Sequence, residues 1–283
     1  MKNFYDFEGK LEYTKELIHC WVEAFNGQVY VAFSGGLGST VLLDIVRKLY
    51  PNVVAVFNNT GLEYPEIVSH VRTFDNVIEL RPKYSFKQII EKYGYPVISK
   101  EQSQFIKEYR NTKSDNLKNT RWNGNKWGRG KISEKWKYLV NAPFKIGEQC
   151  CTYLKKNPAK KFEKETGKHP FLGNMAEESS FRMQNLKRYG CNAYDMKRPV
   201  SKPLSYWTQS DLWEYIAKYD IKYSKIYDMG YKRTGCMFCM YGAQLEKEPN
   251  KFQLMKTTHP LQYKFCMEKL NLKEILDYLN IPY

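Results

Sequence analysis

The sequence lacks any apolar run of the length that a membrane-spanning helix needs, about 18 to 20 residues. Residues 1–6 contain no apolar segment of the kind that directs secretion. We therefore expect no membrane contact and a cytoplasmic protein. Only 7 of the 283 residues are cysteine, an odd number. In that compartment they are expected to be thiols or metal ligands rather than a disulfide framework.

Acidic residues are scarce relative to basic ones. The chain has 45 Lys and Arg residues against 30 Asp and Glu residues, which gives a formal net charge of +15. Such an excess favours an anionic partner, which includes a nucleotide, sulfate or nucleic acid. A lysine-rich surface that only contacts solvent is the alternative.

Apolar segments that are typical of strands alternate with segments of helical periodicity. Strands are expected at 28–33, 53–57, 77–80 and 171–173, and helices at 7–26, 39–49 and 86–93. This alternation predicts an α/β fold with a doubly wound, mostly parallel sheet. From Thr208 the pattern becomes helical, and Thr208 with Asp211 resembles a capping box.

Three parts follow from this pattern. We expect an N-terminal helix at 1–27, a nucleotide-binding α/β domain at 28–205, and a helical C-terminal region at 206–283. The middle part contains an insertion, 107–137, that shows no periodicity.

Two familiar phosphate loops, G-x-x-x-x-G-K-[ST] and G-x-G-x-x-G, are absent at the first strand. A Gly/Ser turn stands there instead, between an apolar strand and an apolar helix. Its candidate phosphate-binding residues are Ser34, Gly35, Gly36, Gly38, Ser39 and Thr40. Backbone N–H groups and the helix dipole attract anions at such a turn, and the hydroxyl groups can donate further. A plain tight turn is the alternative.

Four cysteines form two tight pairs far apart in the chain. They are Cys150, Cys151, Cys236 and Cys239. Soft thiolates of this kind suit an iron–sulfur cluster or zinc, and buried thiols are the third alternative. The other cysteines, Cys20, Cys191 and Cys266, have no partner at a ligand spacing.

The insertion 107–137 holds ten basic residues against three acidic ones, and it contains Trp122, Trp127 and Trp136. Cations interleaved with aromatic rings are typical of surfaces that contact phosphates and stack on bases. Nucleic acid is therefore a candidate partner for this segment, and a solvated insertion is the alternative.

The Gly/Ser turn resembles the SGGxDS pyrophosphate loop of the adenine-nucleotide α-hydrolase (PP-loop ATP pyrophosphatase) superfamily. Further segments resemble one branch of it, the phosphoadenosine phosphosulfate (PAPS) reductase family. They are 57–66 (DTGxExPE), 150–155 (CCxxxK), 173–182 (GxRxxES..R), 203–213 (PL..WT..DVW) and 231–239 (GCxxC). Together they cover about residues 28–242.

The resemblance implies an adenine nucleotide at the loop, with Asn59, Thr60 and Gly61 contributing. It implies a 4Fe-4S cluster held by all four paired cysteines, and Mg²⁺ with the nucleotide. It also implies catalytic roles for a further set of residues. These are Lys155, Glu178 and Arg182.

Three positions depart from the family pattern. Gly38 and Asn59 each stand where the family has Asp, and Met175 stands where it has Arg. The first two departures are expected to weaken metal or phosphate handling, and the third removes a cation near the anion.

The resemblance favours an enzyme that adenylates an acceptor with ATP and supports transfer of sulfur from a donor. The family's alternative chemistry is reduction of a sulfonucleotide (APS or PAPS) by a cysteine on a C-terminal tail. No cysteine follows Cys266, so this alternative ranks second. A degenerate nucleotide-binding subunit is the third.

Overall fold

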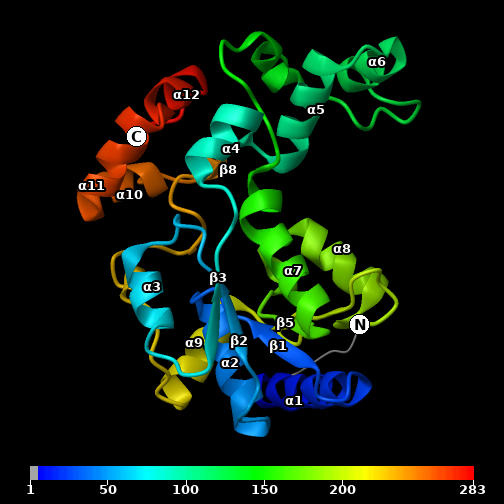
Figure 1. The fold of residues 1–283 in the computed structure, drawn as a ribbon, viewed down its shortest axis with the longest axis vertical. Helices are drawn as coiled ribbons and strands as arrows, with labels where there is room; N and C mark the ends of the chain where they lie inside the picture. Colours follow the sequence, from blue (N-terminus) through cyan, green and yellow to red (C-terminus); the bar gives the residue numbers. More distant parts are fainter. Residues whose placement is uncertain (1–5) are drawn as a thin grey trace. The chain divides into compact units, whose positions relative to one another are not determined.

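The computed structural model describes residues 6–283, and these form two compact units (Figure 1). Unit 1 contains the chain up to Asn59, Tyr64–Arg81 and Pro158–Tyr227. Unit 2 contains Thr60–Glu63, Pro82–Asn157 and Asp228–Tyr283. This division differs from the three expected parts. The N-terminal helix belongs to unit 1, and much of the expected middle domain belongs with the C-terminal segment.

Unit 1 is built on a six-stranded sheet with the order β3-β2-β1-β5-β7-β6. The strands are β1 (Val29–Ala32), β2 (Ala55–Asn58), β3 (Val77–Leu80), β5 (His169–Leu172), β6 (Asn192–Ala193) and β7 (Val200–Ser201). All neighbours are parallel except β6 and β7. The predicted α/β fold with a mostly parallel sheet is therefore confirmed.

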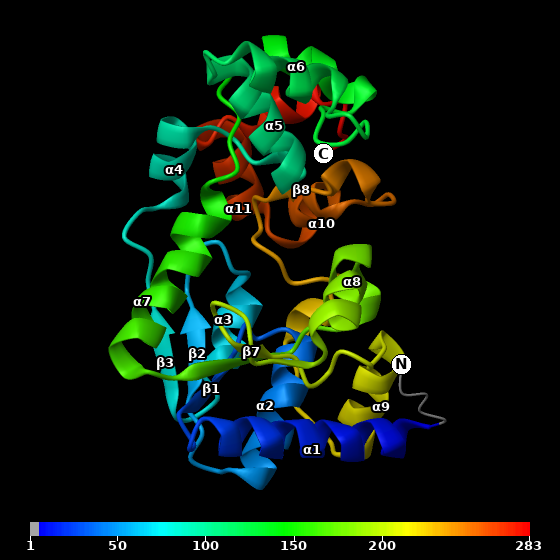
Figure 2. The same ribbon diagram turned by 90° about the vertical axis from the view of Figure 1, so that its right-hand side faces the viewer.

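Helices cover both faces of this sheet. They are α1 (Phe7–Ala24), α2 (Leu37–Leu49), α3 (Pro65–Val71), α7 (Asn157–Thr166), α8 (Ser180–Tyr189) and α9 (Gln209–Lys218), with the short turns η3 (Ala176–Glu178) and η4 (Lys225–Tyr227). Phe162 of α7 packs with Tyr30 and Val56 on one face. Trp21 of α1 packs 6.4 Å from the Phe171 ring. Figure 2 shows α7 on one side of the sheet and α1 and α2 on the other.

Unit 2 is mostly helical. Its elements are α4 (Phe86–Tyr93), β4 (Val97–Ile98), α5 (Lys100–Asn111), α6 (Asp115–Asn123), η1 (Glu134–Asn141), η2 (Thr152–Lys156), β8 (Met240–Tyr241), η5 (Ala243–Leu245), α10 (Lys251–Thr258), α11 (Pro260–Lys264), η6 (Phe265–Lys269) and α12 (Leu272–Tyr278). The strand β4 pairs with β8, although the two strands are far apart in the sequence. Residues 82–157 therefore fold with the C-terminal segment.

The segment 107–137, expected to be irregular, is largely helical. Ser99 and Ser114 accept hydrogen bonds from the first turns of α5 and α6, which defines both helix starts. Few apolar residues anchor the segment, chiefly Phe105, Ile106 and Ile132. The helical period is therefore hidden among lysines and asparagines.

The predicted capping box is confirmed, because Thr208 and Asp211 bond reciprocally at the start of α9. Asp211 also receives the Lys10 ammonium at 2.6 Å, which ties α9 to α1. Among residues 6–283, no helix combines the length and apolarity that crossing a membrane requires.

A polar network fixes α7 to the sheet, and it supplies a test of the fold. The Tyr30 hydroxyl donates to Glu163 at 2.6 Å, and Arg198 Nε donates to the same carboxylate at 2.7 Å. We expect Glu163→Ala to lower the free energy of unfolding by about 1–3 kcal/mol, because both partners lose a charged acceptor. Glu165→Ala, at an exposed site on the same helix, is the control. Equal denaturation midpoints for the two variants would contradict this role.

Candidate nucleotide loop and cysteine centre

The Gly/Ser turn follows β1 at its carboxyl end and leads into α2. The strand β1 lies between β2 and β5. Strands β2 and β3 lie on one side of β1, and the later strands β5, β7 and β6 lie on the other, so the direction in which strands are added reverses at β1. Crevices at such switch points are where open α/β sheets bind ligands. Gly36 is the N-cap of α2 and has no side chain to satisfy the first N–H groups. The loop can therefore offer backbone donors to an anion.

Hydroxyl groups hold the loop in shape. The Ser39 hydroxyl donates to the Gly36 carbonyl at 2.9 Å and lies 3.1 Å from the Ser34 hydroxyl. Gly35 has a φ of +74°, and a Cβ there would lie 2.8 Å from Val71. Ser34 is exposed whereas Ser39 is buried. The loop is thus preformed, and Ser34 is the hydroxyl that remains open to solvent.

Close backbone packing explains why position 38 is a glycine rather than the Asp of the family pattern. A Cβ on Gly38 would lie 2.5 Å from the Gly173 carbonyl oxygen, and a Cβ on Gly173 would lie 2.5 Å from the Gly38 carbonyl oxygen. The start of α2 and the end of β5 therefore touch backbone to backbone. An Asp at position 38 has no room in this arrangement.

Two further loop contacts are internal to unit 1. The Thr40 hydroxyl is buried 3.2 Å from His70 Nε2, and the Leu37 N–H donates to the Tyr227 hydroxyl at 2.9 Å. Burial lowers the pKa of His70. Thr40 thus braces α2 against α3, and the open face of the loop lies at its earlier residues.

Asn59, the second departure from the family pattern, also has a hydrogen-bond partner. The Asn59 side-chain amide donates to Glu79 at 3.0 Å, a contact that an Asp could not make without charge repulsion. Thr60 and Gly61 belong to unit 2. There the Thr60 hydroxyl and backbone N–H both donate to Glu63, at 2.9 and 2.8 Å.

A cavity of about 240 Å³ lies in unit 1 beside η3 and α8. Met175, Arg182, Lys202 and Ser205 help to line it. Arg182 forms an ion pair with Glu178 one turn away. Burial, with the nearby Arg182 charge, lowers the pKa of Lys202. Lys202 was not predicted from sequence, and it supplies a second cation near the position where Met175 replaces Arg.

The two cysteine pairs are brought together by one short segment of unit 2. Tyr95 pairs with Ile146, four residues before Cys150. Two residues later, β4 pairs with β8, which begins directly after Cys239. The segment 95–98 therefore lies between the two strands that position the cysteines.

The Cys150 thiol lies within electrostatic reach of the other three predicted thiols. Burial raises the pKa of Cys150 strongly, and Cys151, Cys236 and Cys239 raise it further. Burial likewise raises the pKa values of Cys151 and Cys236, whereas Lys155 lowers both. Thiols packed in this way repel a second negative charge, so a positively charged metal centre would relieve the strain.

The Lys155 side chain interacts with Cys236 and Cys151. It lies in η2, a π-helical turn that begins directly after Cys151. Burial alone disfavours its charge, but the attraction of Cys236 and Glu63 and a hydrogen bond with Cys236 outweigh burial and raise its pKa. Glu63 was not in the predicted site, although it belongs to the segment that resembles DTGxExPE.

Among residues 6–283, no three acidic, imidazole or thiol groups converge closely enough to enclose one ion. The fit of a cluster rests on the donor set. One buried thiol and three half-buried thiols, with a half-buried lysine, would suit a multi-metal sulfur centre, because soft thiolate ligands prefer such metals. The predicted ligands thus belong together in unit 2, and the loop, Glu178 and Arg182 belong to unit 1.

Comparison with known proteins gives a family match and distant relatives. The phosphoadenosine phosphosulfate reductase domain matches residues 28–121 and 99–241. An adenosine 5'-phosphosulfate reductase of Geobacillus kaustophilus is 25% identical over 216 residues, which are 76% of this chain and 74% of the relative. One from Lysinibacillus sphaericus is 23% identical over 225 residues, 79% of this chain and 78% of the relative.

A solved PAPS reductase of Candida auris has a TM-score of 0.47 and 17% identity, covering 83% of this chain and 98% of its own. That likeness carries no inference about activity.

The cysteine set makes a testable prediction. Changing any one of Cys150, Cys151, Cys236 or Cys239 to Ser should lower the iron content of anaerobically purified protein from about four atoms per chain. The matched control is Cys266→Ser, because Cys266 is buried in η6 of the same unit. One zinc per chain without iron in the unaltered protein would contradict the prediction.

Proposed function

Because the chain belongs to the phosphoadenosine phosphosulfate reductase domain family, we propose that it is an ATP-dependent sulfur-transfer enzyme. In this proposal the loop at 34–40 binds the ATP phosphates, and the four paired cysteines hold a 4Fe-4S cluster. An acceptor is adenylated and then thiolated. The family relationship supports an enzyme of sulfur chemistry.

The observation that carries sulfur transfer over reduction is the position of the remaining cysteines. Reduction of a sulfonucleotide needs an accessible nucleophilic thiol. Cys266 is buried, and burial raises its pKa to about 12. Cys191 is buried as well. Cys20 is exposed on α1, near the amino end of β1 and thus at the sheet edge opposite the loop.

The proposed chemistry conserves atoms and electrons. An acceptor oxygen bonds to the α-phosphorus of ATP while the bond to the bridging oxygen breaks, and pyrophosphate leaves with the electron pair. Sulfide-level sulfur from a donor then displaces AMP, so there is no net oxidation or reduction. The cluster, when bound, would carry or activate the donor sulfur.

The chain's own residues supply positioning and charge. Backbone N–H groups at the start of α2 stabilise the charge that develops on the phosphates, aided by the helix dipole. Arg182 and Lys202 give the cavity beside α8 its affinity for an anion. Glu178 holds Arg182 in place through their ion pair. Lys155 stabilises negative charge on the cysteine set.

The residues present do not fit a resident Mg²⁺ at the family's two Asp positions. Gly38 has no ligand atom and no room for one, and Asn59 donates to Glu79. Any Mg²⁺ would therefore be held by the nucleotide and water, and no step is assigned to it.

Sulfonucleotide reduction is the second candidate. The observation that favours it is the likeness to adenosine 5'-phosphosulfate reductases over three quarters of the chain.

One set of incubations separates these functions. Anaerobic protein should form pyrophosphate and AMP in equal amounts from ATP and sulfide with one of three acceptor pools: bulk tRNA, denatured DNA or small metabolites. Sulfite released from APS or PAPS would overturn sulfur transfer in favour of reduction. Nucleotide binding with no product from any substrate would indicate a degenerate binding subunit.

The loop has its own test. Gly36→Val should weaken ATP binding by about tenfold or more, which is 1.4 kcal/mol, because the added side chain blocks close approach of phosphate to the backbone. Calorimetry of the full chain measures this. Glu165→Ala, at an exposed site of the same unit, is the control. Unchanged ATP affinity in Gly36→Val would place the nucleotide elsewhere.

A further inference from the structure

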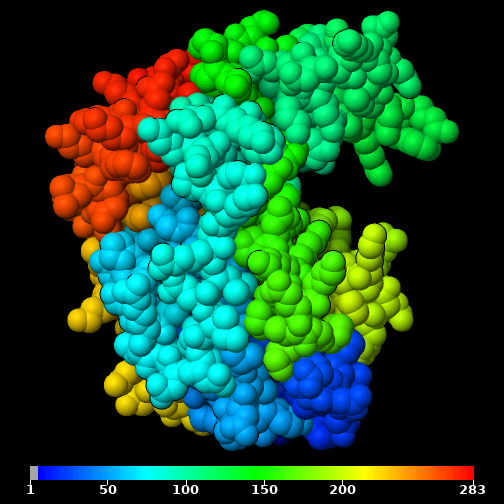
Figure 3. Space-filling model, in the orientation of Figure 1, coloured from blue at the N-terminus to red at the C-terminus, as the bar shows by residue number. Residues whose placement is uncertain are grey.

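The segment 107–137 forms a helical arm of unit 2, which we call the basic arm. It contains the C-terminal end of α5 from Lys107 on, all of α6 and the start of η1. Its atoms lie at the surface in the space-filling view (Figure 3). The loop 123–131 connects α6 to the rest of the arm. Nothing in the proposed adenylation chemistry uses this arm, so its composition calls for a separate explanation.

The ten cations of the basic arm fall into two groups. Four are used within the protein: Lys107 pairs with Glu148, Arg110 donates to the Phe144 and Ala142 carbonyls, Arg121 pairs with Glu108, and Lys137 pairs with Glu134. The other six are exposed, and none has an acidic partner within residues 6–283. They are Lys113, Lys118, Lys126, Arg129, Lys131 and Lys135.

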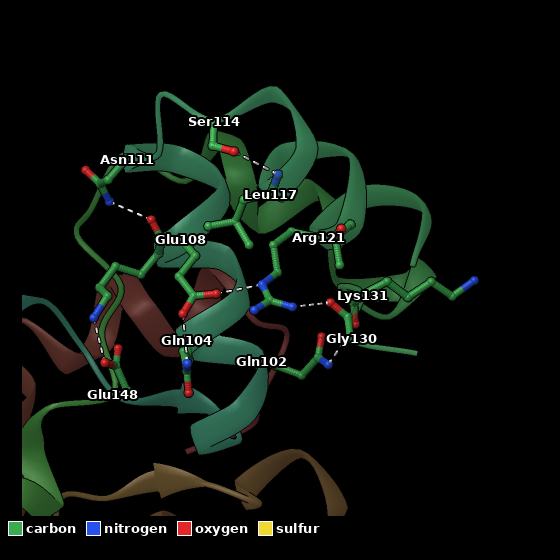
Figure 4. A network of polar contacts seen from close by, with 12 residues as sticks. Gln102, Gln104, Glu108, Asn111, Ser114, Leu117, Arg121, Gly130, Lys131 and Glu148 are labelled. Carbon is green, nitrogen blue, oxygen red and sulfur yellow. Dashed lines mark hydrogen bonds and ion pairs between the residues drawn. The ribbon is translucent and has the colours of Figure 1, made fainter. Parts of the chain in front are cut away.

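The first group explains why the arm is ordered. Arg121 donates to Glu108 at 2.6 Å and to the Gly130 carbonyl at 2.7 Å, so one side chain joins α5, α6 and the end of the loop. Gln102 accepts from the Ser133 N–H at 2.8 Å and donates to the Lys131 carbonyl. Figure 4 shows this network, with the Lys131 side chain extending away from it.

The tip of the loop is also fixed. The Asn125 side chain accepts from the backbone N–H groups of Trp127 and Arg129, each at 3.0 Å. The Asn125 carbonyl accepts from Gly128 at 2.8 Å. Side-chain and backbone bonds of this kind define a tight turn. The turn presents Trp127 with 69% of its surface exposed.

The three tryptophans of the arm therefore have different roles. Trp122 packs 5.1 Å from the Tyr109 ring and lies under Lys137, so it is structural. Trp136 is half-buried beside Tyr138. Trp127 alone among them is exposed; the Lys126 ammonium lies over its ring, 4.4 Å from the centroid, and the exposed Arg129 follows two residues later. An exposed indole on an ordered turn loses little entropy when another ring stacks on it.

We propose that the basic arm is a binding site for a nucleic-acid strand with unpaired bases. Trp127 stacks on one base, and the six exposed cations contact the backbone phosphates on either side. Every base has a flat aromatic face, so one displayed indole suits single strands and loops. A paired duplex hides those faces. The unpaired cations supply the salt-dependent part of the affinity.

This inference goes beyond the proposed adenylation and deepens it, because it names nucleic acid as the class of acceptor. Binding to the arm requires neither ATP nor iron. Binding can therefore fail while adenylation of a small acceptor succeeds, and the reverse outcome can also be distinguished.

The test uses the full chain, purified anaerobically, with fluorescent single-stranded RNA and DNA 20-mers and the matching duplexes, without ATP. We expect both single strands to bind more tightly than the duplexes. Trp127→Ala should weaken single-strand binding by roughly 5- to 100-fold, and Trp127→Phe should restore most of it. Lys131→Gln should lower the slope of log affinity against log salt by about 1.

The matched control is Lys222→Gln, at an exposed lysine of unit 1. It should leave both affinity and salt slope unchanged. Thermal unfolding should be alike for all variants, since each replaces an exposed side chain. Equal binding by Trp127→Ala and the parent chain would overturn the proposal. So would tighter binding to duplex, or heparin binding that exceeds binding to every oligonucleotide.

Discussion

The contact on which the Gly/Ser loop at 34–40 depends is a backbone-to-backbone approach between Gly38 and Gly173. Any side chain at either position would overlap the other residue's carbonyl oxygen. The contact joins the start of α2 to the end of β5, the strand next to β1. A loop held this closely keeps its N–H groups aligned without a ligand, which reduces the entropy lost when an anion binds.

In unit 2, one short segment of backbone, the four residues 95–98, pairs with the chain close to both cysteine pairs. The two cysteine pairs are separated in the sequence by Pro158–Tyr227, which belong to unit 1. Ile98 has a φ of +61°, which is a strained conformation for a β-branched residue. Its carbonyl accepts from the Gly242 N–H at 2.8 Å, directly after β8. The strain is thus held by the same pairing that brings Cys239 toward Cys150.

The sequence predicted what depends on local pattern, and it missed what depends on close packing. Strand β3 and the Thr208 capping box are found where periodicity and cap residues placed them. The division into units was missed, because a two-residue pairing between β4 and β8 leaves almost no signal. The departures at Gly38 and Asn59 suggested lost function. Their partners Gly173 and Glu79 are visible only in three dimensions, and they show that both residues are fitted to their surroundings.

The same distinction applies to charge. A net charge of +15 predicts affinity for anions, but it does not say which cations are available. Some hold the fold together, as Arg198 does on Glu163 and Arg121 on Glu108. One, Lys155, is half-buried where it balances thiols. Six exposed cations without acidic partners among residues 6–283 lie on the basic arm, whose tip is held in a hydrogen-bonded turn at Asn125. Charge on an ordered scaffold discriminates among anions by geometry, whereas charge on a flexible chain attracts all anions alike. The proposed recognition by the arm therefore rests on this order more than on the number of lysines.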